Sequence, residues 1–344
     1  MSLNPQASKQ TNGMIRLTWT PDLTVFGYRF YRDGVAVAKG TRPEQASTTF
    51  KAETDGKSHW YGIGRALEQA TESVEFPEVT PPPPAAGAFM SYPASSAISL
   101  SGVTGRVIEK LSFKQTPAGK SAIVLNGCKD ITIRSVDFKD VPGCVYAVNC
   151  SGIVLDGLRY DNITGPHTRT GANVGNLVQF NVVQGGAVKN CKGRGGDTED
   201  IVSIYASHNI DVDDNHLEGT NWTSPSGSGI ALCDQGGSNN RARRNILVNP
   251  GQVGAFIAGG TGSEISDNII IGVVRPNSNI GIYVWGQGGG ACSGHTVARN
   301  KVSWKKADGS NAPYWNAGNC GPVTGDGSND FNASLDPAAY RVVL

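Results

Sequence analysis

The sequence has few charged residues and no long apolar run. Charged side chains make up 17% of the 344 residues, and the formal net charge is +1. A chain this close to neutrality lacks the basic surface that binds nucleic acid, so we expect no nucleic-acid partner. It also lacks the stretch of about 18 consecutive apolar residues that spans a bilayer, so we expect no membrane insertion.

Paired cysteine motifs and a leader profile are also missing. The seven cysteines are odd in number and contain no Cys-x-x-Cys pair, which argues against a zinc site and leaves at least one thiol free. We expect them to fill stacked interior positions rather than to form a disulfide network. Residues 1–8 lack the charged-then-apolar profile of a signal peptide. We therefore expect a virion or extracellular protein that is exported by another route, such as cell lysis, or has lost its signal.

What the sequence does have is glycine and one proline cluster. The 45 glycines favour a fold with many tight turns. Four consecutive prolines at 81–84 form a semi-rigid spacer, which separates a small unit from a large one. We predict an N-terminal domain at 1–79, a proline-rich linker at 80–87 and a second domain at 88–344.

Short alternating strands are predicted in the N-terminal domain. Ile15, Leu17 and Trp19 alternate with polar residues, as in a half-buried strand. Asp33-Gly34 between apolar runs predicts a hairpin turn, because both residues tolerate positive φ. The segments 17–21 and 27–34 resemble the opening of a fibronectin type III module. The resemblance implies a small β-sandwich that attaches or spaces the rest of the protein.

A repeat of variable length runs through the second domain. Short apolar segments end at residues 136, 158, 190, 215, 245, 268 and 300, with intervals of 22 to 32 residues. A minimum near 22 with variable insertions is typical of β-helix coils, in which loops bulge out between fixed strands. The leucine and asparagine spacing of leucine-rich repeats is absent. We predict an internal ladder of the asparagines that end five of these segments, Asn190, Asn215, Asn245, Asn268 and Asn300.

A second strand series precedes the first in each coil, at 177–180, 201–205, 230–233, 255–258 and 282–285. Over residues 90–310 the chain resembles the pectate-lyase-like superfamily. That resemblance implies an all-β fold, a right-handed parallel β-helix with an irregular C-terminal cap. Together with the N-terminal domain, the architecture is similar to bacteriophage tail-spikes. It implies a polysaccharide partner and assembly as a homotrimer or with virion tail proteins.

Candidate catalytic residues gather in a glycine-rich corner and one coil beyond it. Asp197, Glu199, Asp200 and Asp234 are expected to share one face, with Arg241 nearby. Two carboxylates suit glycoside hydrolysis. A carboxylate-bound Ca²⁺ with an arginine base would suit uronate lysis, although the sequence specifies no cofactor. Alternatively, these acidic side chains only cap turns at coil corners.

Candidate substrate-binding residues are basic or aromatic. They are His167 and Arg169 on an insertion, Arg244, and the recurrent Phe256, Tyr283 and Trp285. Aromatic rings turned outward would stack on sugars or pack against another copy of the chain.

The polygalacturonase motifs are absent, so no known catalytic set transfers to this chain. We therefore expect a β-helix that recognises cell-surface polysaccharide. The alternatives are a secreted polysaccharide lyase or glycoside hydrolase, and a purely structural virion spike.

Overall fold

The computed structural model describes residues 88–165, 175–196, 198–219, 227–288 and 290–344, together with the backbone of seven strands between residues 6 and 76. The chain divides into two compact units, residues 1–86 and 87–344. The predicted linker at 80–87 lies outside the described residues and stays a prediction.

The N-terminal unit contains two antiparallel sheets. One has the order β1-β2-β5, and the other has the order β4-β3-β6-β7. The strands are β1 (Gln6–Lys9), β2 (Met14–Thr18), β3 (Tyr28–Arg32), β4 (Val35–Gly40), β5 (Ser47–Lys51), β6 (His59–Arg65) and β7 (Glu72–Phe76). The strands β3 and β4 flank Asp33-Gly34 as a hairpin would. That this unit is a fibronectin type III module stays a prediction.

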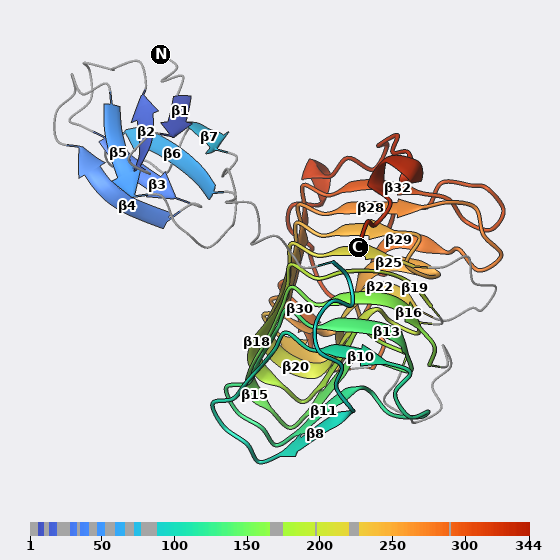
Figure 1. The fold of residues 1–344 in the computed structure, drawn as a ribbon. Helices are drawn as coiled ribbons and strands as arrows, with labels where there is room; N and C mark the ends of the chain where they lie inside the picture. The colour runs from blue at the N-terminus through green and yellow to red at the C-terminus, as the bar shows by residue number, and fades with distance from the viewer. Residues whose placement is uncertain are drawn as a thin grey trace. The chain divides into compact units, whose positions relative to one another are not determined.

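The large unit is a stack of parallel coils, drawn from β8 to β32 in Figure 1. Each coil contributes strands to three columns. The first column contains β8 (Ile98–Ser101), β11 (Ile123–Asn126), β14 (Val145–Val148), β17 (Val178–Asn181), the start of β20 (Val202–Asp213), β22 (Ser228–Ser238), β25 (Val253–Ile257), β29 (Ile280–Val284) and β33 (Tyr314–Asn316).

The second column follows the predicted repeat. It contains β9 (Val107–Glu109), β12 (Thr132–Arg134), β15 (Ser151–Asp156), β18 (Gln184–Lys189), the end of β20, β23 (Arg241–Arg243), β27 (Glu264–Ser266) and β31 (Thr296–Ala298). Two short strands, β26 (Gly260–Thr261) and β30 (Cys292–Ser293), continue from the end of β22.

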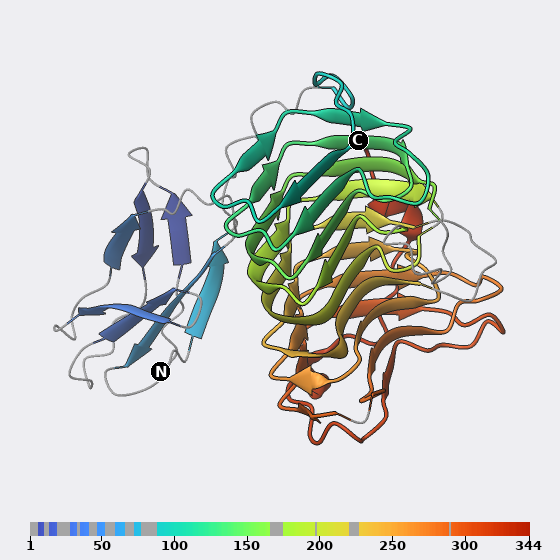
Figure 2. The same cartoon turned by 90° about the horizontal axis from the view of Figure 1, so that it is seen from below.

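The third column forms a separate sheet that the sequence did not reveal. It contains β10 (Ser112–Lys114), β13 (Asp137–Val141), β16 (Arg159–Ile163), β19 (Lys192–Gly196), β21 (His216–Glu218), β24 (Ile246–Val248), β28 (Ile269–Gly272) and β32 (Lys301–Trp304). Figure 2 shows the sheets wrapping around one interior. Ile133, Leu155 and Val188 are fully buried there, and many other aliphatic side chains join them in one continuous core.

An asparagine ladder occupies one buried corner, as the sequence predicts for four of its members. Asn215, Asn245, Asn268 and Asn300 each donate from Nδ2 to the Oδ1 of the next ladder residue, at 2.8–2.9 Å, and the ladder ends at Asn329. Each also donates to a backbone carbonyl of the preceding coil. This pattern satisfies the buried backbone groups where the chain turns.

The prediction that Asn190 belongs to this ladder is wrong by one residue. The ladder position in that coil is Cys191, whose N–H donates to Asn215 Oδ1. Asn190 is exposed, has φ 56° and donates to Asp156. Asparagine is one of the few residues that take this left-handed conformation readily, so it suits the turn as well as the ladder.

After β32 the chain has one three-residue strand, β33, and little other regular structure. Bridges from Thr296 to Thr324 and from Lys301 to Asp330 extend the parallel pairing on either side of the short helix η1 (Asp326–Ser328), and a second short helix, η2 (Pro337–Tyr340), follows. Five cysteines are buried with free thiols, as expected, but Cys292 and Cys320 form a disulfide. No helix among the described residues is long and apolar enough to cross a membrane.

Candidate functional site

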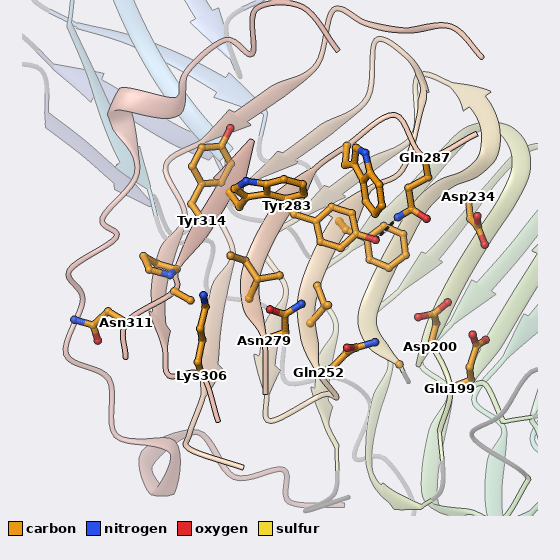
Figure 3. A pocket seen from close by; sticks show the side chains of 18 residues that line it. Glu199, Asp200, Asp234, Gln252, Asn279, Tyr283, Gln287, Lys306, Asn311 and Tyr314 are labelled. Atoms are coloured by element: carbon orange, nitrogen blue, oxygen red, sulfur yellow. Dashed lines mark hydrogen bonds between the residues drawn. The ribbon is translucent and has the colours of Figure 1, made fainter. Parts of the chain in front are cut away.

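A pocket of about 800 Å³ opens over the first column in the C-terminal half of the β-helix (Figure 3). Its walls come from five successive coils, from the segment entering β20 to β33. It is lined by Glu199, Asp200, Gly227, Asp234, Gln252, Val253, Phe256, Asn279, Ile280, Tyr283, Trp285, Gln287, Lys306, Asn311, Ala312, Pro313, Tyr314 and Trp315. Six of the predicted site residues therefore meet in one pocket.

Two carboxylates lie together at the start of β20. Asp200 is 4% exposed, and its Oδ1 accepts a 2.7 Å hydrogen bond from the Ser228 hydroxyl in the next coil. Glu199 is half-buried, and its carbonyl accepts from the Ser228 N–H. Ser228 thus holds this corner with both its backbone and its side chain, and Figure 3 shows both carboxyl groups at the same side of the pocket.

Asp234 lies one coil further along the stack, in β22, and lines the same pocket as Glu199 and Asp200. It pairs with Tyr205, five residues along the chain from Asp200.

An aromatic wall faces these carboxylates. Phe256, Tyr283 and Trp315 are paired in register on three successive strands. The rings of Phe256 and Tyr283 stack with centroids 4.7 Å apart and planes 3° apart, which leaves Phe256 only 7% exposed. Trp285 and Trp315 are 42% and 46% exposed and meet edge to face at 5.9 Å. The two tryptophans therefore form the accessible aromatic surface, while Phe256 supports Tyr283 from below.

Polar side chains complete the pocket beside this wall. Gln287 donates from Nε2 to the Tyr283 hydroxyl at 2.6 Å, which fixes the orientation of both. Gln252, Asn279, Asn311 and Lys306 provide further hydrogen-bonding groups. Burial raises the pKa of Tyr314 to about 12, so its hydroxyl keeps its proton at physiological pH.

The arginines lie elsewhere, so the prediction that they accompany the acidic residues is wrong. Arg241 forms an ion pair with Asp211 at 3.7 Å, in the second column. Arg244 contacts Asp213 and Asp214 at 3.2 and 2.8 Å. Burial opposes the charge of Arg244, but the two carboxylates outweigh it and raise its pKa. Both guanidinium groups thus serve the corner of the β-helix rather than the pocket.

Three predicted residues lie outside the described residues: Asp197, His167 and Arg169. Among the described residues, the group of three side chains close enough to bind one metal ion is Cys292, His295 and Cys320. The predicted calcium therefore has no such group of described carboxylates around it, and it stays a prediction.

Two residues that line the pocket, Trp315 and Lys306, were not predicted from the sequence. Trp315 lies in register with Tyr283, and Tyr314-Trp315-Asn316 repeats the pattern of Ile282-Tyr283-Val284. The insertion between β32 and β33 hid this alignment. Lys306 lies in that insertion and has no signal in the sequence, because only the fold brings it to the pocket.

The family model described as "Right handed beta helix region" matches residues 121–302, more than half of the chain. The protein therefore belongs to the right-handed β-helix family, and the columns described above are those of this class. No curated protein matches it in sequence.

Solved structures with similar chains include three enzymes. The catalytic domain of a GH87 α-1,3-glucanase in complex with tetrasaccharides is 11% identical, with TM-score 0.31, and covers 95% of this chain and 92% of its own. Pectate lyase PelI from Erwinia chrysanthemi in complex with tetragalacturonic acid is 12% identical, with TM-score 0.21 and coverage of 87% and 85%. The family 28 exopolygalacturonase of Yersinia enterocolitica is 8% identical, with TM-score 0.24 and coverage of 92% and 97%. These similarities assign no activity to this chain.

Proposed function

We propose that this protein recognises cell-surface polysaccharide through the pocket over β22, β25, β29 and β33. The observation that supports this most strongly is the composition of the pocket wall. Two exposed tryptophans stand beside a ring of amide, carboxylate and ammonium groups. Sugars have an apolar face of C–H bonds and a rim of hydroxyl groups. Aromatic rings and hydrogen-bonding side chains match those two features.

The shape of the surface favours a sugar over a second copy of the chain. An outward aromatic stripe also suits subunit packing, which the sequence leaves open. Trp285 and Trp315, however, line a hollow with polar groups on its other sides. Ligand sites are concave, with a few convergent polar groups, whereas subunit contacts are broad and close-packed.

We also propose a setting for the protein. A β-helix that follows a small module of two β-sheets suits a tail-spike-like protein, virion-associated or extracellular. In that setting the first unit, a fibronectin type III-like module, would attach the spike, and the β-helix would assemble as a homotrimer or with virion tail proteins. Native mass spectrometry of the full chain tests the trimer. A monomer at micromolar concentration would contradict it without affecting the pocket.

Binding to a panel of oligosaccharides, measured by titration calorimetry, tests the recognition itself. We expect at least one glycan to bind, and we expect Trp285→Ala to weaken that binding about thirtyfold, as truncation of a central aromatic contact does. Val107→Ala is the matched control, because Val107 is similarly exposed, at 51%, but lies at the opposite end of the β-helix. An unchanged affinity in Trp285→Ala would remove the pocket from the proposal.

A second candidate function is glycoside hydrolysis. It is favoured by Glu199 and Asp200, two carboxylates that line the same end of the pocket. Release of reducing ends from a bound glycan, lost in both Glu199→Gln and Asp200→Asn, would establish hydrolysis. Binding that persists without any released ends would leave recognition alone. The uronate-lyase alternative is weaker, because Arg241 pairs with Asp211 and does not line the pocket.

A further inference from the structure

The disulfide between Cys292 and Cys320 joins the two segments that carry the exposed tryptophans. Cys292 follows the segment of Trp285, and Cys320 follows the segment of Trp315. The same two segments are held by a second contact between Gly286 and Asn319. Asn319 Oδ1 accepts from the Gly286 N–H at 3.0 Å, and its Nδ2 donates to the Gly286 carbonyl at 3.0 Å.

The packing at this point is close. A Cβ atom on Gly286 would lie 3.1 Å from the Cβ of Cys292, so the chain beside Trp285 lies directly against the disulfide. On the other segment, the Ala317 N–H donates to the Val284 carbonyl at 3.0 Å, one residue before Trp285. Movement of either cysteine would therefore reach the edge-to-face contact of the two tryptophans.

A buried histidine lies beside the disulfide. His295 is 0% exposed, and its Nε2 lies 3.4 Å from Cys292 Sγ. Its Nδ1 accepts a hydrogen bond from the Ser263 N–H at 3.2 Å. A neutral ring whose Nδ1 is an acceptor has its proton on Nε2, which then points at the sulfur. That tautomer cannot offer Nε2 to a metal ion, so it disfavours the metal site that the grouping of Cys292, His295 and Cys320 would otherwise suggest.

The geometry points to a thiol–disulfide exchange site, which we propose regulates the glycan pocket. The proposal rests on the proposed function. A dithiol reductant attacks Cys292 Sγ, because Cys292 is partly exposed whereas Cys320 is fully buried. Cys320 leaves as a thiolate and takes up a proton. The second sulfur of the reductant then closes its own disulfide and releases the Cys292 thiolate toward the His295 Nε2–H. Two electrons and two protons pass to the protein, and the reductant is oxidised to its disulfide.

The affinity of the pocket for glycan therefore depends on the redox state of the compartment. Structural disulfides persist outside the cell and are reduced in the cytosol. Under reducing conditions the segments of Trp285 and Trp315 lose their covalent link and keep only hydrogen bonds, so the two side chains must be ordered when a glycan binds, which lowers affinity. Under oxidising conditions the wall is already formed.

The test uses the full chain with and without dithiothreitol, and thiol titration verifies that reduction exposes two further thiols. We expect reduction to weaken glycan binding about tenfold and to change tryptophan fluorescence, with the change lost in Trp285→Phe. The matched control is the double variant Cys292→Ser, Cys320→Ser, whose affinity should match the reduced protein and ignore the reductant. Unchanged affinity and fluorescence after complete reduction would overturn the proposal.

Two further outcomes separate the steps. If no glycan binds in either redox state, the proposed function fails. Tryptophan fluorescence and hydrogen exchange over residues 283–287 and 314–320 then decide whether the disulfide orders the aromatic wall. The role of His295 is tested by the pH dependence of Cys292 alkylation in the reduced protein. His295→Leu should move that profile to higher pH, because the thiolate loses its donor. An unmoved profile would overturn the role of His295.

Discussion

The early coils and the late coils of the β-helix share a backbone but fill the same positions with different chemistry. At one corner, Val136, Leu158 and Cys191 occupy the position that the asparagine ladder takes from Asn215 onward. In each coil the carbonyl of the residue at this position accepts a hydrogen bond from a backbone N–H at the start of the third-column strand in the next coil, which shows that the positions are equivalent. Each of these residues is fully or almost fully buried. The corner therefore changes from apolar to polar halfway along the stack.

The other corner makes the same change. Ile131, Ile153 and Ile210 are fully buried where the second column begins. In the following coils this position holds Asn240, Ser263 and His295, whose side chains accept hydrogen bonds from the backbone N–H groups of Ile210, Asn240 and Ser263.

The outward face changes as well. Tyr146, Gln179 and Ser203 precede Ala231, Phe256, Tyr283 and Trp315 in a single register. Phe256 and Tyr283, two residues of the aromatic wall, thus lie in coils whose two corners are both polar. We infer that the hydrogen bonds of the ladder help to keep the aromatic wall in place.

Breaking the ladder should have the largest effect. Asn245→Leu leaves Val212 without its side-chain donor and leaves the Asn215 amide and N–H without an acceptor. Several buried polar groups lose partners together, so we expect a loss of about 3–5 kcal/mol in the free energy of unfolding, measured in urea. In the early coils, Leu158→Met keeps the corner apolar and should cost less than about 1.5 kcal/mol. Equal losses would mean that the two corners do not differ energetically.

The second test concerns the outward-facing position of the first column, which Trp315 occupies in the last coil. Trp315→Ala should weaken glycan binding by about 2 kcal/mol, measured by calorimetry, because a half-exposed ring of the pocket wall is removed. Gln179→Ala changes the same register position three coils before Phe256 and should leave affinity unaltered. If both variants bind normally, the aromatic wall does not contact the ligand.

The sequence revealed the fold because coils repeat, and it revealed less of the site because the site does not. Two of the three columns, and four ladder asparagines, follow from periodic apolar residues. The third column was not predicted because strands such as Ser112–Lys114 are only three residues long, which is too short to show an alternation of apolar and polar residues. Asn190 was misplaced because asparagine suits both the ladder and the adjacent left-handed turn.

The site residues divide in a similar way. Phe256 and Tyr283 were found because they recur in one strand series. Arg241 was misassigned because the sequence places it near Asp234, whereas the fold turns it into the second column beside Asp211. Lys306 reaches the pocket through an insertion, and no local pattern marks such a residue.

The polar corner should also make stability depend on pH. Burial lowers the pKa of His295 below its ordinary value of 6.5. As pH falls below about 6.5 the unfolded chain takes up a proton that the folded chain excludes, so stability decreases, by at most about 1.4 kcal/mol per pH unit. Above that pH both states are neutral and the dependence disappears. Urea unfolding between pH 5 and 7.5 measures this slope, and His295→Gln should reduce it. His208→Gln, which alters a histidine bonded to Ser238 outside the corner, is the control.

The smallest expected effect concerns a feature that both halves share. Along the second column the charges alternate from Glu109 to Arg134, then from Asp156 to Lys189, and from Asp213 to Arg243. The early pair of Glu109 and Arg134 is exposed, so Glu109→Gln should lower stability only slightly, and the effect should vanish at high salt. Asp213 is only 2% exposed and accepts from both Arg243 and Arg244. Asp213→Asn should therefore lower the free energy of unfolding by more, and salt should not remove the loss, because a buried pair is poorly screened.

Urea titrations of both variants at two salt concentrations measure the difference. An equal response to salt would mean that the charge ladder is uniform along the stack, and that the division between early and late coils is confined to the two corners and the outward face.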